Sequence, residues 1–176
     1  MAVSTSAVIT ANIEVTQVKP KADTVADSNL TLKSKSQPYT FAYATSDLNT
    51  AFVARYAIAG SGDEDVDLSG TLEDLFGDEA VFVTVKGVLI VNHSNSPLGG
   101  QTATDADVTV TGNFLDNNLG SSFSADLAAG GMFMFSEPGG LGVVNSSSDT
   151  ITITNNDGVD TAYVDVVAIG ADMSGI

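Results

Sequence analysis

Residues 149–169 read DTITITNNDGVDTAYVDVVAI, and this stretch decides the fold class. Its two ends, 149–155 and 160–169, alternate apolar with polar side chains. This period of two is typical of a β-strand with one buried face. The Asp157-Gly158 pair between the two runs indicates a tight turn, so we expect them to form a β-hairpin.

The same alternation recurs along the chain, and long helical periodicity is missing. The strongest strand signal is 80–92, AVFVTVKGVLIVN, where Gly87 is expected to mark a bulge. Further strands are expected at 39–45, 51–59, 106–114, 131–136 and 141–145. Eight to ten short strands predict an all-β protein, namely an antiparallel β-sandwich of jelly-roll type. Residues 1–38 are expected to form a partly extended N-terminal arm, and 39–176 the sandwich domain.

One short helix is expected after residue 70. Thr71 to Asp74 have the pattern of a capping box, and Gly77 provides the stop signal. Glycine pairs elsewhere, including Gly139-Gly140 after Pro138, are interpreted as turns. In 132–135 methionine alternates with phenylalanine, so one pair faces the core. The other pair faces outward and would form an interface if exposed.

The charge is strongly acidic and unevenly distributed. The chain has 176 residues, no cysteine and a net charge of −16. All six basic residues lie in the first 86 positions, namely Lys19, Lys21, Lys33, Lys35, Arg55 and Lys86. This balance argues against nucleic-acid binding and against binding to an anionic membrane, which need clustered basic residues. The absence of cysteine removes disulfides, thiolate metal sites and cysteine nucleophiles.

The first residues, MAVSTSAVITANIEV, lack a basic segment and a long apolar core. We therefore expect no signal peptide and synthesis in the cytoplasm.

Residues 60–70, GSGDEDVDLSG, resemble a calcium loop because Asp63, Asp65 and Asp67 have the spacing of the first three ligands. The sixth position of such a loop needs glycine and is Leu68, and the twelfth is Asp74 where glutamate is usual. The stretch fits a strand better, with Val66 and Leu68 on one face and the aspartates on the other. Weak calcium binding by the three carboxylates stays open, and we assign no metal ligand here.

His93 is the only histidine, and no nucleophile motif or second metal ligand accompanies it. We interpret it as a surface loop residue. The sequence therefore predicts no enzyme, no catalytic residue and no cofactor site.

Lys19, Lys21, Lys33 and Lys35 are the sharpest feature outside the expected core. Two interpretations remain open. One is a solvated, flexible arm, and the other is an arm that docks onto an acidic partner protein through these four lysines.

Three stretches resemble a known family. The first is DVDLSGTLEDLFG at 65–77, which is followed by the strand 81–91. The others are SEPGGLGV at 136–143 and the ending DTITITNNDGVDTAYVDVVAIGAD at 149–172. Their order is similar to that in a group of small β-rich virion proteins of tailed bacteriophages.

The resemblance implies a virion protein that decorates or cements the capsid shell, with the major capsid protein or other virion proteins as partners. It also implies a homo-oligomer, expected to be a trimer. Two alternatives stay open: a tail tube, adaptor or fibre-base subunit, and a β-sandwich module that binds carbohydrate or a cell surface. The resemblance transfers no catalytic or binding residues.

Overall fold

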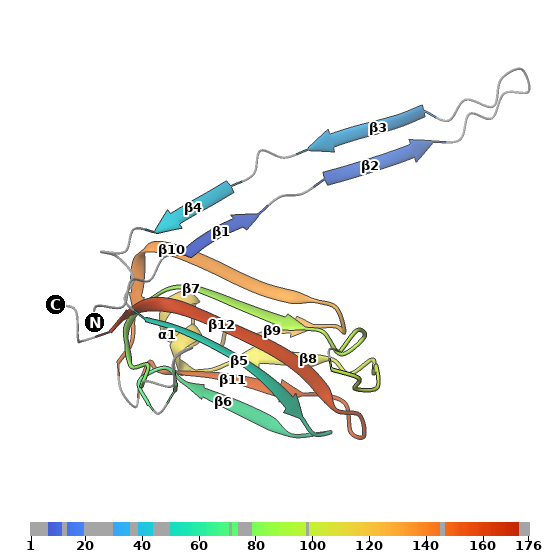
Figure 1. Ribbon diagram of the computed structural model, residues 1–176. Helices are drawn as coiled ribbons and strands as arrows, with labels where there is room; N and C mark the ends of the chain where they lie inside the picture. Colours follow the sequence, from blue (N-terminus) through green and yellow to red (C-terminus); the bar gives the residue numbers. More distant parts are fainter. Residues whose placement is uncertain are drawn as a thin grey trace, which may run out of the picture. The chain divides into compact units, whose positions relative to one another are not determined.

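The computed structural model describes residues 7–11, 14–19, 30–35, 39–43, 50–70, 72–73, 79–97, 99–144 and 147–172, with side chains from 50 to 171 within these ranges. The chain divides into two compact units (Figure 1). The smaller is Val8–Ala42, and the larger contains Tyr43–Ile176 together with Met1–Ala7. The division falls between residues 42 and 43, whereas the sequence placed it at 38.

The larger unit is built from two four-stranded antiparallel sheets. One sheet has the strand order β10-β7-β12-β5 and the other β6-β11-β8-β9. The bounds are β5 Thr50–Ile58, β6 Asp63–Asp67, β7 Phe82–Asn92, β8 Val108–Thr111, α1 Asn113–Leu119, β9 Ala125–Leu127, β10 Met132–Gly142, β11 Thr150–Asn155 and β12 Ala162–Asp172.

The strand pairing is nested, and this identifies the topology. β5 pairs with β12, β6 with β11, β7 with β10 and β8 with β9. Such nesting is what results when one long hairpin of four strand pairs is folded over into two sheets. The pairs β7–β12 and β8–β11 then complete the sheets. The expected jelly-roll sandwich is confirmed.

The core lies between the two sheets and is lined by alternate residues of each strand. On β7, Val85, Val88 and Ile90 are buried. The buried positions change from odd-numbered to even-numbered before Val88, next to a register irregularity near Gly87. On β11, Ile151 and Ile153 are fully buried, while the alternating Thr150, Thr152 and Thr154 are only partly buried. The period of two in the sequence therefore has the expected physical cause, which is one buried face per strand.

The helix α1 closes part of the core and was not expected from the sequence. Phe114 and Leu115 are fully buried in the core cluster. Asn113 Oδ1 accepts the backbone N–H groups of Asp149 at 2.9 Å and Thr150 at 2.7 Å, which ties the start of the helix to β11. The expected strand 106–114 is therefore wrong beyond Thr111. The helix expected at Thr71–Gly77 falls largely outside the described residues.

The expected hairpin at Asp157-Gly158 is also wrong. The turn lies where expected, but β11 and β12 belong to different sheets, so the chain crosses the sandwich there. The buried Asn155 holds this crossing. Its Nδ2 donates to the carbonyl oxygens of Ile58 at 3.0 Å, Ala59 at 3.1 Å and Asp160 at 2.8 Å, and its Oδ1 accepts the backbone N–H of Asp157 at 3.0 Å. The side chain replaces the ladder bonds that a hairpin would supply.

Pro138-Gly139-Gly140 does not reverse the chain as expected. These residues lie inside the single strand β10, where the register with β7 shifts between Ser136 and Leu141. Proline has no N–H for a ladder bond and is tolerated in a strand at such an irregularity.

The described residues of the smaller unit lie in two two-stranded ladders, one of which also includes Ala7 and Tyr43 of the larger unit. β1 Ala7–Ala11 pairs with β4 Tyr39–Tyr43, and β2 Glu14–Lys19 pairs antiparallel with β3 Leu30–Lys35. The strand at 39–43 was expected in the sandwich, but its hydrogen-bonded partner is β1.

Candidate functional site

The outer face of the β10-β7-β12-β5 sheet carries a row of apolar side chains that crosses all four strands. Met134 on β10 lies opposite Leu89, Leu89 opposite Val167, and Val167 opposite Val53. Met134 is 39% exposed and Val53 46%. These directly opposite residues lie close enough for their side chains to form one surface.

The next row along the strands extends this surface on β10 and β7 only, and it ends at the charged pair of Asp165 and Arg55. Met132 is 63% exposed and lies opposite Val91, and Val91 lies opposite Asp165. We name the outward Val53, Leu89, Val91, Met132, Met134 and Val167 the apolar sheet face. Phe133 and Phe135 point the other way and pack against the core. The methionine pair is therefore the outward one, and exposed methionine is a soft, adaptable contact surface.

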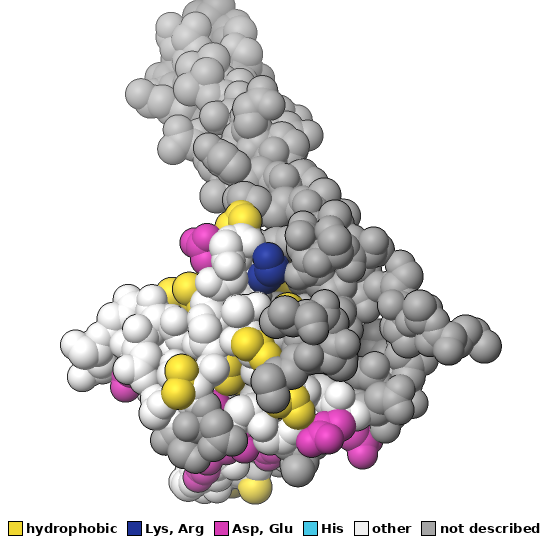
Figure 2. Space-filling view, turned by 90° about the vertical axis from the view of Figure 1, so that its left-hand side faces the viewer, with side chains coloured by type: hydrophobic (Ala, Val, Ile, Leu, Met, Phe, Trp, Pro, Cys, Tyr) yellow, Lys and Arg dark blue, Asp and Glu magenta, His cyan; other side chains and the backbone are white. Residues whose placement is uncertain are grey.

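The outer face of the β6-β11-β8-β9 sheet has the opposite chemistry. Asp65 lies opposite Thr152, and Thr152 Oγ1 donates to Asp65 Oδ1 at 2.6 Å. On the same outer face, near the opposite edge of the sheet, Thr109 Oγ1 donates to Asp126 Oδ1 at 2.7 Å. We name the outward Asp63, Asp65, Asp67, Asp126, Thr109 and Thr152 the acidic sheet face. In the view of Figure 2, most acidic side chains lie along the lower border, with a further group at the upper left, and hydrophobic side chains lie between them.

The strand interpretation of Asp63, Asp65 and Asp67 is confirmed. All three are exposed on β6, and the intervening Val66 and the following Leu68 are fully buried. Side chains two residues apart on a strand are separated by about 7 Å, so the three carboxylates do not converge. Asp67 Oδ1 instead accepts the backbone N–H of Ser69 at 3.1 Å.

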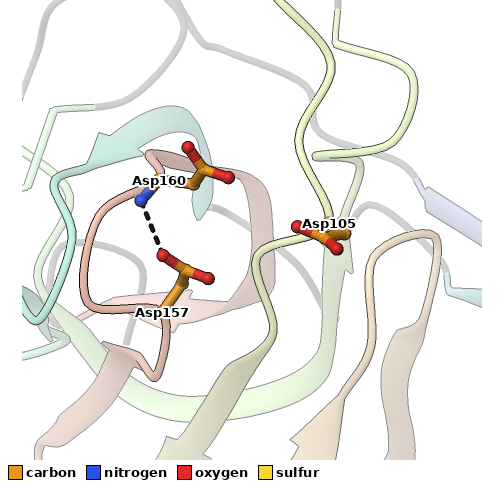
Figure 3. Close-up of side chains that lie close together, drawn as sticks. All are labelled: Asp105, Asp157 and Asp160. Carbon is orange, nitrogen blue, oxygen red and sulfur yellow. Dashed lines mark hydrogen bonds between the residues drawn. The ribbon is translucent and has the colours of Figure 1, made fainter.

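Three other carboxylates do converge, at one end of the sandwich. Asp105 comes from the β7–β8 connection, and Asp157 and Asp160 come from the turn before β12 (Figure 3). One carboxylate oxygen from each lies within 4.8 Å of the others. The adjacent open depression, lined by Asp105, Asp107, Asn156 and Asp157, has a volume of about 240 Å³.

Asp157 is held in this acidic cluster by the backbone of its own turn. Its Oδ1 accepts the N–H groups of Asp160 at 2.6 Å and Val159 at 2.7 Å. These two hydrogen bonds favour the carboxylate and lower the pKa of Asp157 from its ordinary value. Three carboxylates supply oxygen ligands of the kind that calcium prefers, but calcium takes six to eight. Exposed acidic groups also gather without an ion, so the cluster alone does not identify a cation site.

His93 is not the surface loop residue that the sequence suggested. Its side chain is only 12% exposed, and its Nε2 lies 3.3 Å from Asp165 Oδ1 without the geometry of a hydrogen bond. The neighbouring Ser94 is engaged in the fold, because its Oγ donates to Asn92 Oδ1 at 2.6 Å and accepts the N–H of Tyr163 at 2.9 Å. The Ser94 hydroxyl is therefore taken up by the fold and does not hydrogen-bond His93.

Comparison of the chain with protein-family models, curated proteins and solved structures finds no match. Function is therefore inferred from the fold and its surface chemistry. In the part of the chain that the structure describes, no helix is long and apolar enough to cross a membrane.

The four arm lysines are only partly placed. Lys19, Lys33 and Lys35 lie in the β2–β3 ladder, opposite Leu30, Thr16 and Glu14 respectively, whereas Lys21 lies outside the described residues. Positions 33 and 35 belong to one face of that ladder, and position 19 belongs to the other. The docking role of these lysines stays a prediction.

Sequence reasoning missed the acidic cluster and the apolar row. The cluster joins Asp105 to the turn 157–160, and only the strand order brings these two segments together. The signal was present as two loops with closely spaced aspartates, at 105–107 and 157–160. The apolar row needs the register of four strands, which no single segment contains.

Proposed function

We propose that this protein is a non-catalytic structural protein of a tailed-bacteriophage virion, which decorates or cements the capsid through protein–protein contacts. The virion assignment rests on the sequence resemblance. The observation that carries the contact role is the row Met134, Leu89, Val167 and Val53 on the outer face of one sheet. Contiguous apolar surface of this kind marks contact sites on soluble proteins.

The two sheets suit the two environments of a decoration protein. The apolar sheet face fits the shell, where burial of the methionine and valine side chains stabilises the contact. The two basic residues of the described sandwich, Arg55 and Lys86, lie on strands of this same sheet. The acidic sheet face, which carries only negative charges, suits exposure to water and repels other acidic surfaces.

The absence of enzymatic activity is part of the proposal. The hydroxyl of Ser94, next to the single histidine, is engaged in the fold. Two carboxylates of the acidic cluster, Asp105 and Asp157, line an open depression whose lining includes no aromatic side chain. A sugar-binding cleft normally presents aromatic platforms, so the carbohydrate-binding alternative gains no support from this site. The major capsid protein is the proposed partner, with the arm lysines as a second contact.

The test is binding of the purified protein to capsids that lack it, compared between two variants. Met134→Asp places a charge on the apolar sheet face, at its β10 end. Val159→Asp makes the same chemical change on the β11–β12 turn, where Val159 is 88% exposed. We expect Met134→Asp to weaken capsid binding at least about tenfold and Val159→Asp to bind like the unaltered protein. Circular dichroism checks that both variants are folded.

Two results would overturn the capsid proposal. If the unaltered protein binds isolated tails and not capsids, the tail alternative replaces it. If it binds neither, the virion assignment fails. Equal binding by both variants would remove the apolar sheet face from the contact.

A further inference from the structure

The four edge strands of the sandwich differ in how they are protected from pairing with another strand. β6 carries acids at four of its five positions, β9 has only three residues, and β10 contains Pro138 and a register break. Charge, shortness, proline and irregularity are the usual means by which proteins block an open edge. β5 has none of these except one charge, Arg55, and Asp165 neutralises that charge.

The β5 edge is also long and regular. All nine residues from Thr50 to Ile58 pair with β12 without a register shift. Within the described residues, no strand pairs with its other side. An edge of this kind is the template to which a further strand adds by β-augmentation.

The backbone groups at the open edge can be assigned. The carbonyl of Tyr163 accepts the N–H of His93, and its own N–H donates to Ser94 Oγ, so both groups point toward β7. The next residue, Val164, therefore points toward β5 and bonds its partner Tyr56. By alternation, the even-numbered residues of β5 bond β12. The odd-numbered residues present N–H and C=O at the open edge, namely Ala51, Val53, Arg55 and Ala57.

The sequence of this edge is self-complementary. Residues 51–57 read Ala-Phe-Val-Ala-Arg-Tyr-Ala, which is nearly palindromic about Ala54. An antiparallel copy centred there places Ala51 opposite Ala57, Phe52 opposite Tyr56, and Val53 opposite Arg55. Phe52 and Tyr56 both lie on the core side, so the aromatic pair would continue the core across the junction.

We propose that β5 pairs antiparallel with β5 of a second copy of this chain, about a twofold axis at Ala54, to form one continuous eight-stranded sheet. The odd-numbered residues then exchange about eight backbone hydrogen bonds across the junction. Each Arg55 faces Val53 and not the other Arg55, whereas a register that aligns the two arginines would place like charges opposite each other. The contact is isologous and gives a dimer, in contrast to the trimer expected from the sequence.

Charge restricts the pairing of two copies to this edge and fixes its salt dependence. Each chain carries a net charge of −16, so two copies repel through most of their surface. The β5 edge is the long edge with a neutralised charge, so copies can meet there. Because the junction itself is neutral, added salt screens the long-range repulsion and strengthens the dimer.

The experiment is sedimentation equilibrium of the purified full chain at several concentrations and two salt concentrations. Val53→Pro removes an N–H that faces the open edge and leaves the β12 bonds intact. Val53→Lys places a positive charge opposite Arg55 of the second copy. Val159→Lys, on the β11–β12 turn, is the matched control for the added charge.

We expect the unaltered chain and Val159→Lys to dimerise, more tightly at higher salt, and both Val53 variants to dissociate at least about tenfold more readily. Near-identical circular dichroism shows that the variants fold. The proposal is overturned if the unaltered chain stays monomeric, or if the Val53 variants dimerise as tightly as Val159→Lys. Self-association is measured without capsids and Met134→Asp leaves the β5 edge intact, so this result and the capsid result are independent.

Discussion

Arg55 on β5 and Asp165 on β12 lie directly opposite each other, and their side chains form a two-point ion pair. Nε lies 2.7 Å from Oδ1, and Nη2 lies 3.1 Å from Oδ2. The hydrogen bond to Asp165 raises the pKa of Arg55, and the same carboxylate lies 3.3 Å from His93 Nε2. One acid on the central strand thus neutralises the only charge on the open edge strand, and the edge keeps no net charge to repel a copy of itself.

Reversal of this charge tests that relationship. Arg55→Glu places two carboxylates opposite each other on β5 and β12, and like charges in that position weaken strand pairing. We expect the amide hydrogens of β5 that bond β12 to exchange severalfold faster with deuterium than in the unaltered chain. Arg55→Gln, which removes the charge without reversing it, is expected to fall between the two. Unchanged exchange in Arg55→Glu would show that the pair does not hold the edge strand.

The acidic cluster gives a prediction about pH. The backbone N–H groups of Asp160 and Val159 hold the pKa of Asp157 below its ordinary value of 3.8. A carboxylate whose pKa is lower in the folded than in the unfolded state stabilises the fold above the unfolded value. That contribution is lost as pH falls below 3.8 through the folded pKa. Titration of the Asp157 carboxyl carbon by NMR should give a midpoint below 3.8, and a midpoint at or above it would contradict the assignment of these bonds.

Gly112 and Gly120 flank α1. Alanine substitutions at these two positions distinguish the cost of a strained backbone from the cost of a steric collision. Both have a positive φ, 127° and 134°, which side chains rarely adopt. A Cβ at Gly112 would also collide with the backbone of β11 at Thr150 and Ile151, whereas a Cβ at Gly120 meets nothing within 4 Å. We expect Gly112→Ala to lower the free energy of unfolding by about 3 kcal/mol or more, and Gly120→Ala by about 1–2 kcal/mol. Urea denaturation measures both. Equal losses would mean that β11 moves aside freely.

The buried face of α1 gives a second matched pair. Phe114 is fully buried in the core cluster, while Leu119 at the other end of the helix is exposed. Phe114→Ala should cost about 3–5 kcal/mol because it opens a cavity. Leu119→Ala should cost about 1 kcal/mol or less, since little apolar area is lost. Thermal and urea unfolding check the difference. A small loss for Phe114→Ala would mean that α1 is not part of the core.

The sequence was sufficient for the fold class and for most strand positions, because alternation such as Thr150 to Thr154 directly reflects one buried face. Prediction from the sequence failed where the same local pattern occurs in two different structures. The Asp157-Gly158 turn has the chemistry of a hairpin, yet whether the flanking strands pair depends on partners elsewhere in the chain. The sequence NFLDNNL of α1 contains three asparagines and lacks clear helical periodicity, and Asn113 forms the helix start by bonding β11 rather than by local capping.

The candidate sites were less predictable, for the same reason. The sequence does not show which pair of side chains on β10 faces outward. In the structure Phe133 and Phe135 pack against the core, so Met132 and Met134 face outward. The row that makes the apolar sheet face exists only in the register of four strands, and the acidic cluster only in the approach of two distant loops. The palindrome of β5 was readable from the start, but it has meaning only because β5 lies at a sheet edge.

Asn155 provides the test of the sandwich crossing itself. Its buried side chain donates to three carbonyl oxygens, those of Ile58, Ala59 and Asp160, and accepts the N–H of Asp157. Asn155→Ala leaves these groups without their partner, and a buried polar group without a partner costs about 1–3 kcal/mol. We expect a loss of about 3 kcal/mol in the free energy of unfolding. The neighbouring Asn156 is exposed, and its Nδ2 donates to Thr109 Oγ1. Asn156→Ala removes this one hydrogen bond and should lower the free energy of unfolding by about 1 kcal/mol or less. Similar losses in the two variants would show that the crossing is held by the turn backbone, and that the side chain of Asn155 contributes little.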